Sequence, residues 1–359
     1  MSTILKIRFF SILLLCVLFS QCEKDPVKTL YFDLSGVNGV FITNEGNYLS
    51  GNASLSFYDY SSHRVYNNVF TARNEIPLGD VCQSMVIHNG LGYIVVNNSG
   101  KIEVIDINTV ESKGTITGLT SPRYIHFLND DKAYVTDLYA KYISVINPQL
   151  QNITGKIDVD NHTSASLTQH TTEQMVQYGN YLFINCWSYD NKILVIDTKT
   201  DRLVDSIEVP VQPASLVLDK DNKLWILTDG GFPGNPAGHE SPALVRIDAA
   251  TRKVENVYRF NMGDKPSRLC LNGNRDTLYY LNNGVWQMPV DKDFQSAKKI
   301  IPENNRLFYA LAVKPGNSRI FVSDAIDYQQ NGQVYVYSAK GEPVDSFKVG
   351  IIPGSFCFK

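Results

Sequence analysis

The sequence predicts an all-β protein built from seven four-stranded units, and three observations support this prediction. Apolar strand-like runs that end in Asn or Asp recur along the chain, each followed by a loop, a second run, a short turn and a third run. Another short apolar run precedes each of these groups, and the pattern repeats every 40–53 residues. The two ends of the repeating region each carry a strand that lacks its neighbour. Four strands per unit at this period are the signature of a β-propeller, so we expect a seven-bladed ring.

Residues 1–21 precede the repeats and predict a cleaved signal peptide. A basic start leads into an apolar run from Phe9 to Phe19, which is too short to span a bilayer. Cys22 then opens the polar stretch "CEKDP", which resembles a bacterial lipoprotein signal in which this cysteine is acylated. Gln21 departs from the small residue that usually precedes such a cysteine. Ordinary secretion with an unmodified Cys22 therefore stays open as the alternative.

Residues 22–29 are expected to link the lipid to the propeller, which we place at residues 30–359. The "EKD" after the cysteine is similar to the acidic export tag of surface-exposed Bacteroidetes lipoproteins. This resemblance implies a protein of the outer membrane, exposed at the cell surface and attached to the membrane only through its lipid anchor.

Each unit can be recognised by its first two strands. Six first strands read "QSMVIH", "RYIHFL", "EQMVQY", "ASLVLD", "SRLCLN" and "YALAVK". The residues that end the seven second strands are Asn44, Asn97, Asp137, Asn185, Asp229, Asn282 and Asp324. We expect these Asn and Asp side chains to bond the backbone of the turns they begin, and not to bind metal.

The two chain ends are predicted to share one blade. The C-terminal "GSFCFK" is a first strand with no second strand after it, and "GVFITN" at residues 39–44 is a second strand with no first strand before it. Pairing the two would close the ring and remove exposed sheet edges.

Composition excludes nucleic acid as a partner. The net charge is −3 and no basic run gives a local electrostatic footprint. The cysteines that remain after Cys22 form no CxxC pair, so buried free thiols are expected in place of a metal site.

Aromatic residues gather in loops that a propeller would place on one face. The stretch "INCWSYDNKILVID" sets Trp187 and Tyr189 between two strands, where a tight hairpin would use Asn-Gly or Asp-Gly. Loops between second and third strands emerge on the same face as the loops that join blades. Comparable loops carry Tyr48, Tyr139, Phe232, His239 and Tyr328, and the inter-blade loop "DNHTSASLTQHTTEQ" adds His162, Gln169, His170, Glu173 and Gln174. Such a surface indicates ligand binding, with packing of the loops on each other as the alternative.

Catalysis has little support in the sequence. His162, His170 and His239 lack a fixed metal-ligand spacing, and we expect them to be solvated. No G-x-S-x-G elbow supports a Ser-His-Asp site, and no partner in sequence makes Glu173 a general base. We therefore expect a binding protein with neither a metal nor a catalytic residue.

Two family resemblances narrow the function. "KAYVTD…ISVINPQ" and "KILVIDTKTDRLVDSIEV" resemble the YVTN/YncE-like propellers over nearly the whole mature chain. "TTEQMVQYGNYLFINCWSYDNKILVID" and "PASLVLDKDNKLWILTDGGFPGNPAGHESPALVRIDAATRKVE" are similar to the Bacteroidetes surface propeller lipoproteins of the BtuG group. The second resemblance implies capture of cobalamin, or a related corrinoid, and its handover to a TonB-dependent outer-membrane transporter.

A cobalamin binder needs a broad face with apolar rings and neutral hydrogen-bonding groups. Aromatic side chains of the loops would supply the area, and Asn185, Asn235, Gln169 and Gln174 could meet the amides at the rim of the ligand. Two other functions stay open. One is a platform for a protein partner, and the other is a metal-dependent lactonase-like or lyase-like propeller enzyme.

Overall fold

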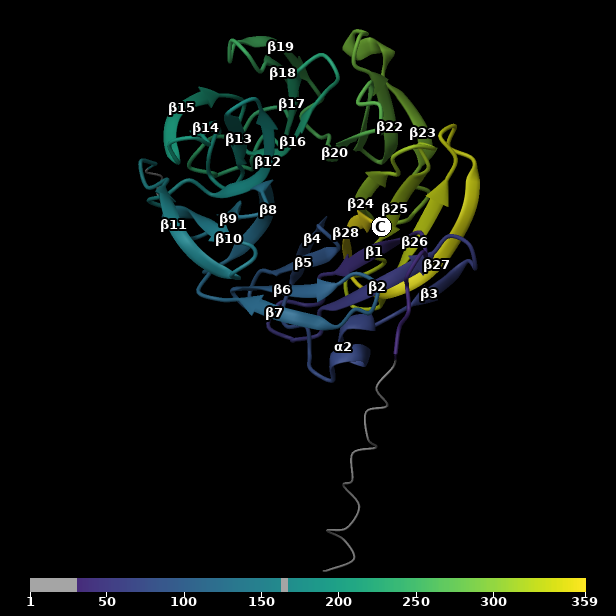
Figure 1. Cartoon of the computed structure of the whole chain (residues 1–359). Helices are drawn as coiled ribbons and strands as arrows, with labels where there is room; N and C mark the ends of the chain where they lie inside the picture. The colour runs from purple at the N-terminus through teal and green to yellow at the C-terminus, as the bar shows by residue number, and fades with distance from the viewer. Residues whose placement is uncertain (1–30, 163–166) are drawn as a thin grey trace, which may run out of the picture.

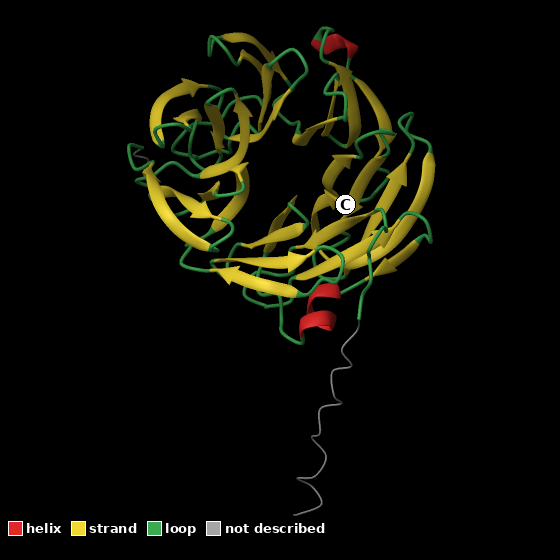
Figure 2. Ribbon diagram, in the orientation of Figure 1, coloured by secondary structure: helices red, strands yellow, loops and turns green. Residues whose placement is uncertain are grey.

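The computed structural model describes residues 31–162 and 167–359. The predicted signal peptide, the linker and Cys22 lie outside the described residues. The described chain forms seven antiparallel four-stranded sheets arranged in a ring (Figures 1 and 2). This confirms the predicted all-β, seven-bladed propeller.

The first strand named for each blade is the innermost one, next to the ring axis, and the fourth is the outermost. Blade 1 consists of β28 (Pro353–Phe358), β1 (Gly39–Asn44), β2 (Ser54–Asp59) and β3 (Arg64–Tyr66). Blade 2 consists of β4 (Cys82–His88), β5 (Leu91–Val96), β6 (Lys101–Asp106) and β7 (Ser112–Ile116). Blade 3 consists of β8 (Pro122–Asn129), β9 (Lys132–Asp137), β10 (Tyr142–Asn147) and β11 (Asn152–Asp158). Blade 4 consists of β12 (Thr172–Tyr178), β13 (Tyr181–Cys186), β14 (Lys192–Asp197) and β15 (Arg202–Glu208). Blade 5 consists of β16 (Pro213–Leu218), β17 (Lys223–Thr228), β18 (Ala243–Asp248) and β19 (Val254–Arg259).

Blade 6 consists of β20 (Ser267–Leu271), β21 (Thr277–Leu281), β22 (Gly284–Pro289) and β23 (Lys298–Pro302). Blade 7 consists of β24 (Phe308–Val313), β25 (Ile320–Asp324), β26 (Asn331–Tyr337) and β27 (Pro343–Ile351). The innermost strands contact one another in sequence around the ring, and β24 contacts β28 to complete it. Helical structure is confined, within the described residues, to α2 (Val69–Asn74) and the 3₁₀ turn η1 (Phe294–Ser296).

Hydrophobic packing between neighbouring blades holds the ring together. Seven clusters of buried side chains are present, and each joins residues of two adjacent blades. The second strands supply much of this core, and all six residues of β1 are buried. The outer strands are open to solvent, as in β19, where five of six residues are exposed. This gradient explains why second strands read as continuous apolar runs and fourth strands do not.

The chain ends close blade 1 as predicted. Strand β28 pairs antiparallel with β1, with Val40 opposite Phe358 and Phe41 opposite Cys357. Phe356 and Phe358 pack on the cluster between blades 7 and 1. The closure therefore pairs the inner edge of β1, so that blade 1 has four strands like the other six blades.

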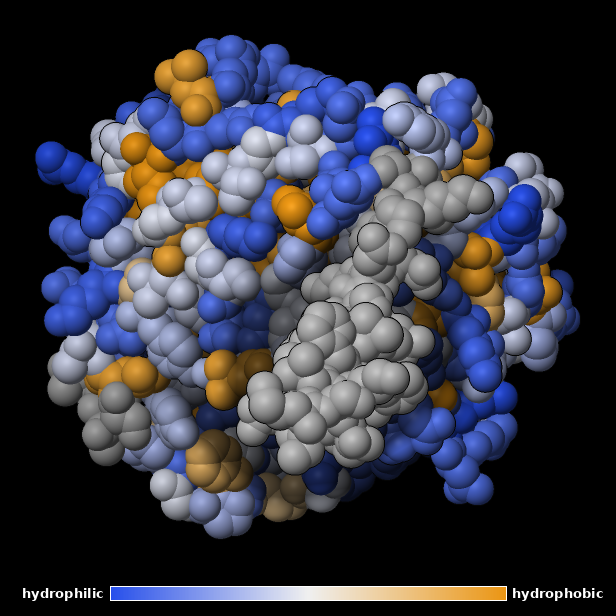
Figure 3. Space-filling model, turned by 90° about the horizontal axis from the view of Figure 1, so that it is seen from below, coloured by the Kyte–Doolittle hydropathy of each residue, from blue (hydrophilic) through white to orange (hydrophobic). Residues whose placement is uncertain are grey.

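Among the described residues no helix is long and apolar enough to cross a membrane. The side of the ring seen in Figure 3 is mainly hydrophilic, with hydrophobic residues in separate groups. Cys82, Cys186, Cys270 and Cys357 are free thiols, as predicted, and all but the partly buried Cys270 are buried.

Candidate functional site

A β-bulge occurs at the same place in every innermost strand, near the start of the strand. The register to the second strand shifts there by one residue in each blade. A bulge leaves one residue unpaired and turns its side chain away from the alternation of the strand. The seven residues at this position are Gly354, Gln83, Arg123, Glu173, Ala214, Arg268 and Tyr309.

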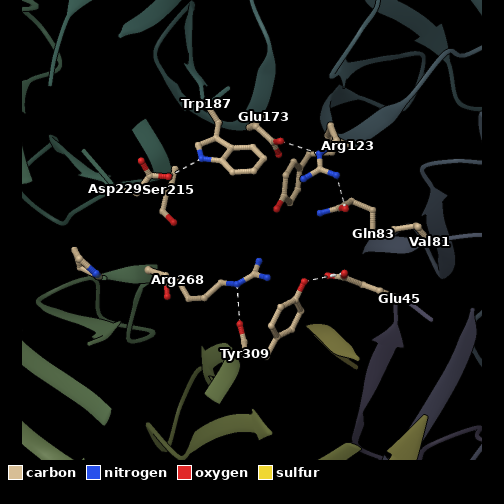
Figure 4. A pocket seen from close by; sticks show the side chains of 14 residues that line it. Glu45, Val81, Gln83, Arg123, Glu173, Trp187, Ser215, Asp229, Arg268 and Tyr309 are labelled. Carbon is tan, nitrogen blue, oxygen red and sulfur yellow. Dashed lines mark hydrogen bonds and ion pairs between the residues drawn. The ribbon is translucent and has the colours of Figure 1, made fainter. Parts of the chain in front are cut away.

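These bulge positions surround a cavity of about 380 Å³ on the axis of the ring (Figure 4). Six of the seven bulge residues line it. The seventh is Gly354, and there Glu45 from the neighbouring loop fills the place of a side chain, because a Cβ on Gly354 would collide with the Glu45 carboxylate. Glu45 also lines the cavity, so all seven blades contribute to one site.

Arg123 lies on one wall of the cavity in a fixed arrangement. Its Nε donates to Glu173 Oε1 over 2.8 Å, and its Nη1 donates to Gln83 Oε1 over 2.6 Å. Burial works against the charge of this guanidinium, but Glu173, together with Tyr124 and Glu45, outweighs burial and the pKa of Arg123 is raised. Its charge is therefore largely neutralised by a partner of its own.

Arg268 has a different environment. Its backbone is in the left-handed region, with φ 58°, and its side chain extends toward the middle of the cavity in Figure 4. Its Nε donates to the backbone oxygen of Tyr309 over 2.8 Å. Among the described residues, no side chain accepts a hydrogen bond from its two Nη groups. A guanidinium with free donors is suited to bind a carboxylate, phosphate or amide oxygen.

Glu45 and Tyr309 complete this side of the cavity. The Tyr309 hydroxyl donates to Glu45 Oε2 over 2.9 Å. Burial raises the pKa of Glu45 above its ordinary value, and Arg268 only partly offsets this effect. The raised pKa favours the neutral form of Glu45, and a neutral Glu45 competes less strongly than a charged one with an anionic ligand for Arg268.

Trp187 presents an aromatic surface to the same cavity, as the sequence placed it over this face. Its indole Nε1 donates to Asp229 Oδ2 over 2.9 Å, which fixes the ring. Asp229 is held in turn by Gln212 Nε2 and by the backbone N–H of Gly231. The ring is oriented by hydrogen bonds across two blades, which prepares it for stacking on a ligand.

The other predicted aromatic residues lie on loops around the cavity and not in it. Tyr189 packs edge-to-face on Phe232, with ring centroids 6.1 Å apart. Tyr328 packs in the same way on Tyr309, at 5.8 Å. Tyr48 and Tyr139 are 68% and 57% exposed, and Phe232 is also exposed. The loops therefore leave apolar surface uncovered on the face where the cavity opens.

Several polar residues that the sequence suggested as ligand contacts have structural roles. Asn185 is fully buried and its Nδ2 donates to the backbone oxygen of Pro213 in the next blade. Glu173 is a member of β12, not of a loop, and is paired with Arg123. Gln174 accepts a hydrogen bond from the backbone of Leu216. Each of these three side chains thus bonds a neighbouring blade. The buried Oδ1 of Asn185 has no hydrogen-bond partner among the described residues, and Glu173 also lines the cavity.

Two of the remaining polar candidates are covered and one is open to solvent. Gln169 and Asn235 are buried, and Asn235 donates to Gln212. His239 is exposed, and its backbone forms an isolated bridge with Gly231. None of the three lines the cavity.

Asn and Asp residues at the ends of the second strands have the structural role that was predicted. Asp137 Oδ1 accepts the backbone N–H groups of Tyr139 and Ala140 in the turn that follows. Asp324 accepts the N–H of Ile326 in the same way. Asn97 instead reaches the next blade and donates to Pro122. These side chains fix turns and blade junctions.

The expectation that the loop histidines are solvated is wrong for His170. This residue is buried, and its Nδ1 lies 2.6 Å from Asp190 Oδ2. The His162 ring stacks on it with centroids 4.8 Å apart. The two histidines and Asp190 form a cluster outside the cavity.

Sequence reasoning missed five polar residues of the cavity, three of them ionisable to a charge at neutral pH (Glu45, Arg123 and Arg268) and two neutral (Gln83 and Tyr309). A usable signal was present, because these residues, apart from Glu45, lie at or next to the first residue of the aligned first strands, from "QSMVIH" to "YALAVK". Each repeat has one position that interrupts the strand alternation, and several of these positions carry a polar or charged residue beside an apolar run. This recurring position indicates the site.

A second cavity lies farther along the same inner strands. It measures about 440 Å³ and shares Tyr124 with the first one. Its lining includes Val86, Phe127, Met175 and Leu216. The axis of the ring is thus polar where the bulges lie and apolar beyond them.

The fold and this cavity define a seven-bladed propeller whose inner strands build a polar, ligand-sized site on the ring axis. Residues 38–358 match the family described as a domain of unknown function, DUF5074, and the chain belongs to this family. A comparison with curated proteins gives no match.

Solved structures of other propellers resemble the chain at low sequence identity. A quinonprotein alcohol dehydrogenase-like protein from Bacteroides thetaiotaomicron has a TM-score of 0.68 at 16% identity, covering 89% of this chain and 79% of that chain. The periplasmic gluconolactonase PpgL of Pseudomonas aeruginosa has a TM-score of 0.66 at 13% identity, covering 90% and 99%. Apo AztD from Citrobacter koseri has a TM-score of 0.57 at 11% identity, covering 90% and 98%. At these identities the likeness establishes the fold alone.

Proposed function

We propose that this protein captures a ligand at the axial cavity and releases it unchanged, and that the ligand is cobalamin or a related corrinoid. The observation that carries the proposal is the convergence of seven blades on one cavity, in which Arg268 has free donors and Trp187 offers a ring. Pockets of about 300–1,000 Å³ are typical of small-molecule sites, and this cavity is near the lower limit of that range.

The size of the cavity determines how a corrinoid would bind. The macrocycle is too wide to be enclosed, so it would lie across the mouth against Trp187 and the exposed rings of the surrounding loops. One substituent of the macrocycle would then enter the cavity. Cobalamin carries a phosphodiester and several amides, and Arg268 is suited to either oxygen. A rigid ligand on a preformed scaffold loses little conformational entropy, which favours tight binding.

The remainder of the proposal concerns location. Acylation at Cys22 would hold the propeller at the outer-membrane surface, and a TonB-dependent transporter would receive the ligand. Support comes from the sequence pattern at residues 1–29 and from the resemblance to the cobalamin-capturing propellers. A protein that only captures and transfers its ligand needs no general base, which agrees with the pairing of Glu173 to Arg123.

Titration calorimetry with cyanocobalamin tests the proposal. We expect saturable binding of one ligand per chain, with unchanged ligand recovered afterwards. No heat and no co-elution at micromolar concentration would contradict the cobalamin assignment and favour a protein partner on the same face. Hydrolysis of a lactone that is abolished by a chelator would contradict the non-catalytic function.

The role of Arg268 can be tested separately with cobinamide, which lacks the phosphodiester. Arg268→Gln should weaken cobalamin binding by about 1.5–3 kcal/mol, as expected for a hydrogen bond to a charged group, and should leave cobinamide binding nearly unchanged. Arg64→Gln is a matched control, because it removes one positive charge from outer strand β3, away from the cavity. An equal loss for both ligands would mean that Arg268 binds an amide or supports the cavity wall.

A further inference from the structure

The loops of blade 4 contain a second candidate site, separate from the axial cavity. It consists of His162, His170 and Asp190, whose potential ligand atoms all lie within 4.8 Å of one another. His170 Nδ1 is 2.6 Å and His162 Nε2 is 3.9 Å from Asp190 Oδ2. Two imidazoles and one carboxylate are a donor set that binds zinc with a position left open.

The environment of Asp190 is the second, independent observation. Its side chain is 0% exposed. Among the described residues, neither Lys nor Arg forms an ion pair with it, and the two histidines are its only potentially cationic partners. A buried carboxylate without a permanent counter-charge is costly. A divalent cation would supply that charge.

The spacing of the three side chains also suits a metal. Tetrahedral zinc with bonds of about 2.05 Å separates its ligand atoms by about 3.3 Å. The separations of 2.6 Å and 3.9 Å from Asp190 Oδ2 lie on either side of this value. All three ligand atoms lie within 4.8 Å of one another, so shifts of no more than about 1.5 Å would reach tetrahedral spacing. His162 is 18% exposed and gives access from solvent. Its Nε2 is 3.2 Å from the Tyr189 backbone oxygen, a weak contact that a metal bond would replace.

No fourth protein ligand is needed. Cys186 precedes the loop of Asp190 and is fully buried, but its thiol is not a member of the cluster. The fourth position is therefore left to water or another small ligand. We propose that His162, His170 and Asp190 bind one zinc ion on the face that carries the axial cavity.

Zinc binding would act on the loop that carries the proposed ligand contacts. Asp190 directly follows Tyr189, and the same loop contains Trp187. A metal ion bound by His162 and His170 and also by Asp190 would fix the loop from Trp187 to Asp190 to the loop that carries the two histidines. The proposal does not rest on cobalamin as the ligand, because the cluster does not contact the axial cavity.

Equilibrium dialysis against Zn²⁺, with metal measured by mass spectrometry, tests the site. The protein should be purified without a polyhistidine tag and with Cys22→Ser in every sample, so that neither a tag nor that thiol binds metal. We expect one zinc per chain at micromolar free metal and a rise in melting temperature with zinc. Bound Co²⁺ should give the visible bands of a four-coordinate site.

Two variants decide whether these residues are the ligands. His162→Gln should weaken zinc binding by about tenfold or more, the lower end of what disturbing a metal site costs, while the melting temperature without metal stays near that of the parent. His239→Gln, on another loop of the same face, is the matched control and should bind zinc normally. No stoichiometric zinc in the parent, or equal binding by His162→Gln, would overturn the proposal.

Discussion

Removal of residues 354–359 should destroy the ring, because strand β28 is the inner strand of blade 1. The deletion takes away the ladder to β1 at four paired positions from Val40 to Thr43 and leaves only Asn44 opposite Pro353. It also removes Phe356 and Phe358 from the cluster between blades 7 and 1, and the buried Cys357.

The cost can be worked out from these contacts. A ladder of this length contributes about 3–5 kcal/mol at about 1 kcal/mol per hydrogen bond. Two half-buried Phe side chains and one buried Cys add about 3–4 kcal/mol. The sum of about 6–9 kcal/mol is comparable to the whole stability of a typical protein, about 5–15 kcal/mol.

Differential scanning calorimetry measures the effect. We expect the truncated protein to melt at least about 15 °C lower than the full chain, or to show no cooperative transition. Deletion of Lys359 alone is the control, because it removes only the contacts of its own side chain and backbone N–H with carbonyls near the start of the fold. A synthetic peptide of residues 352–359 should restore part of the transition. Wild-type melting of the truncated protein would refute closure through β28.

Three further predictions concern the site and the anchor. Trp187→Ala should weaken cobalamin binding by about 1–4 kcal/mol with little change in melting temperature, and Tyr189→Ala should do the same, while a joint loss of stability and binding would assign these rings to loop packing. Because burial raises the pKa of Glu45, the folded protein keeps a proton that the unfolded chain has lost. The free energy of unfolding should therefore fall as pH rises from about 4.5 through the raised pKa. Glu45→Gln should remove that slope and be the more stable form at pH 7, and parallel stability curves would contradict this. Cys22→Ser should release the protein from outer membranes into the soluble fraction, whereas retention without any partner protein would exclude the lipid anchor.

Much of the axial cavity was hidden from the sequence by the bulges. Side chains in a strand alternate between two faces, and one extra residue reverses the assignment of the residues that follow. The bulges turn Arg123 and Arg268 toward the ring axis, which strand alternation alone does not predict. Trp187 could be placed because it lies in a loop, where alternation does not apply. Asn185 was misjudged because β13 continues one residue farther, to Cys186, and buries it.

The sequence by itself determined the seven blades, the four strands in each and the closure by the two ends. These features follow from apolar runs that each unit carries in its own sequence and that recur at a regular period along the chain. Only the tertiary structure decided which residues meet at the axis and in the cluster of His162, His170 and Asp190. One residue per blade, drawn from seven distant segments, makes the cavity, and the cluster joins two loops that are 20 residues apart between His170 and Asp190. Such meetings depend on the curvature of the ring and on bulge geometry, which are collective properties of the packed sheets and cannot be seen in any single repeat.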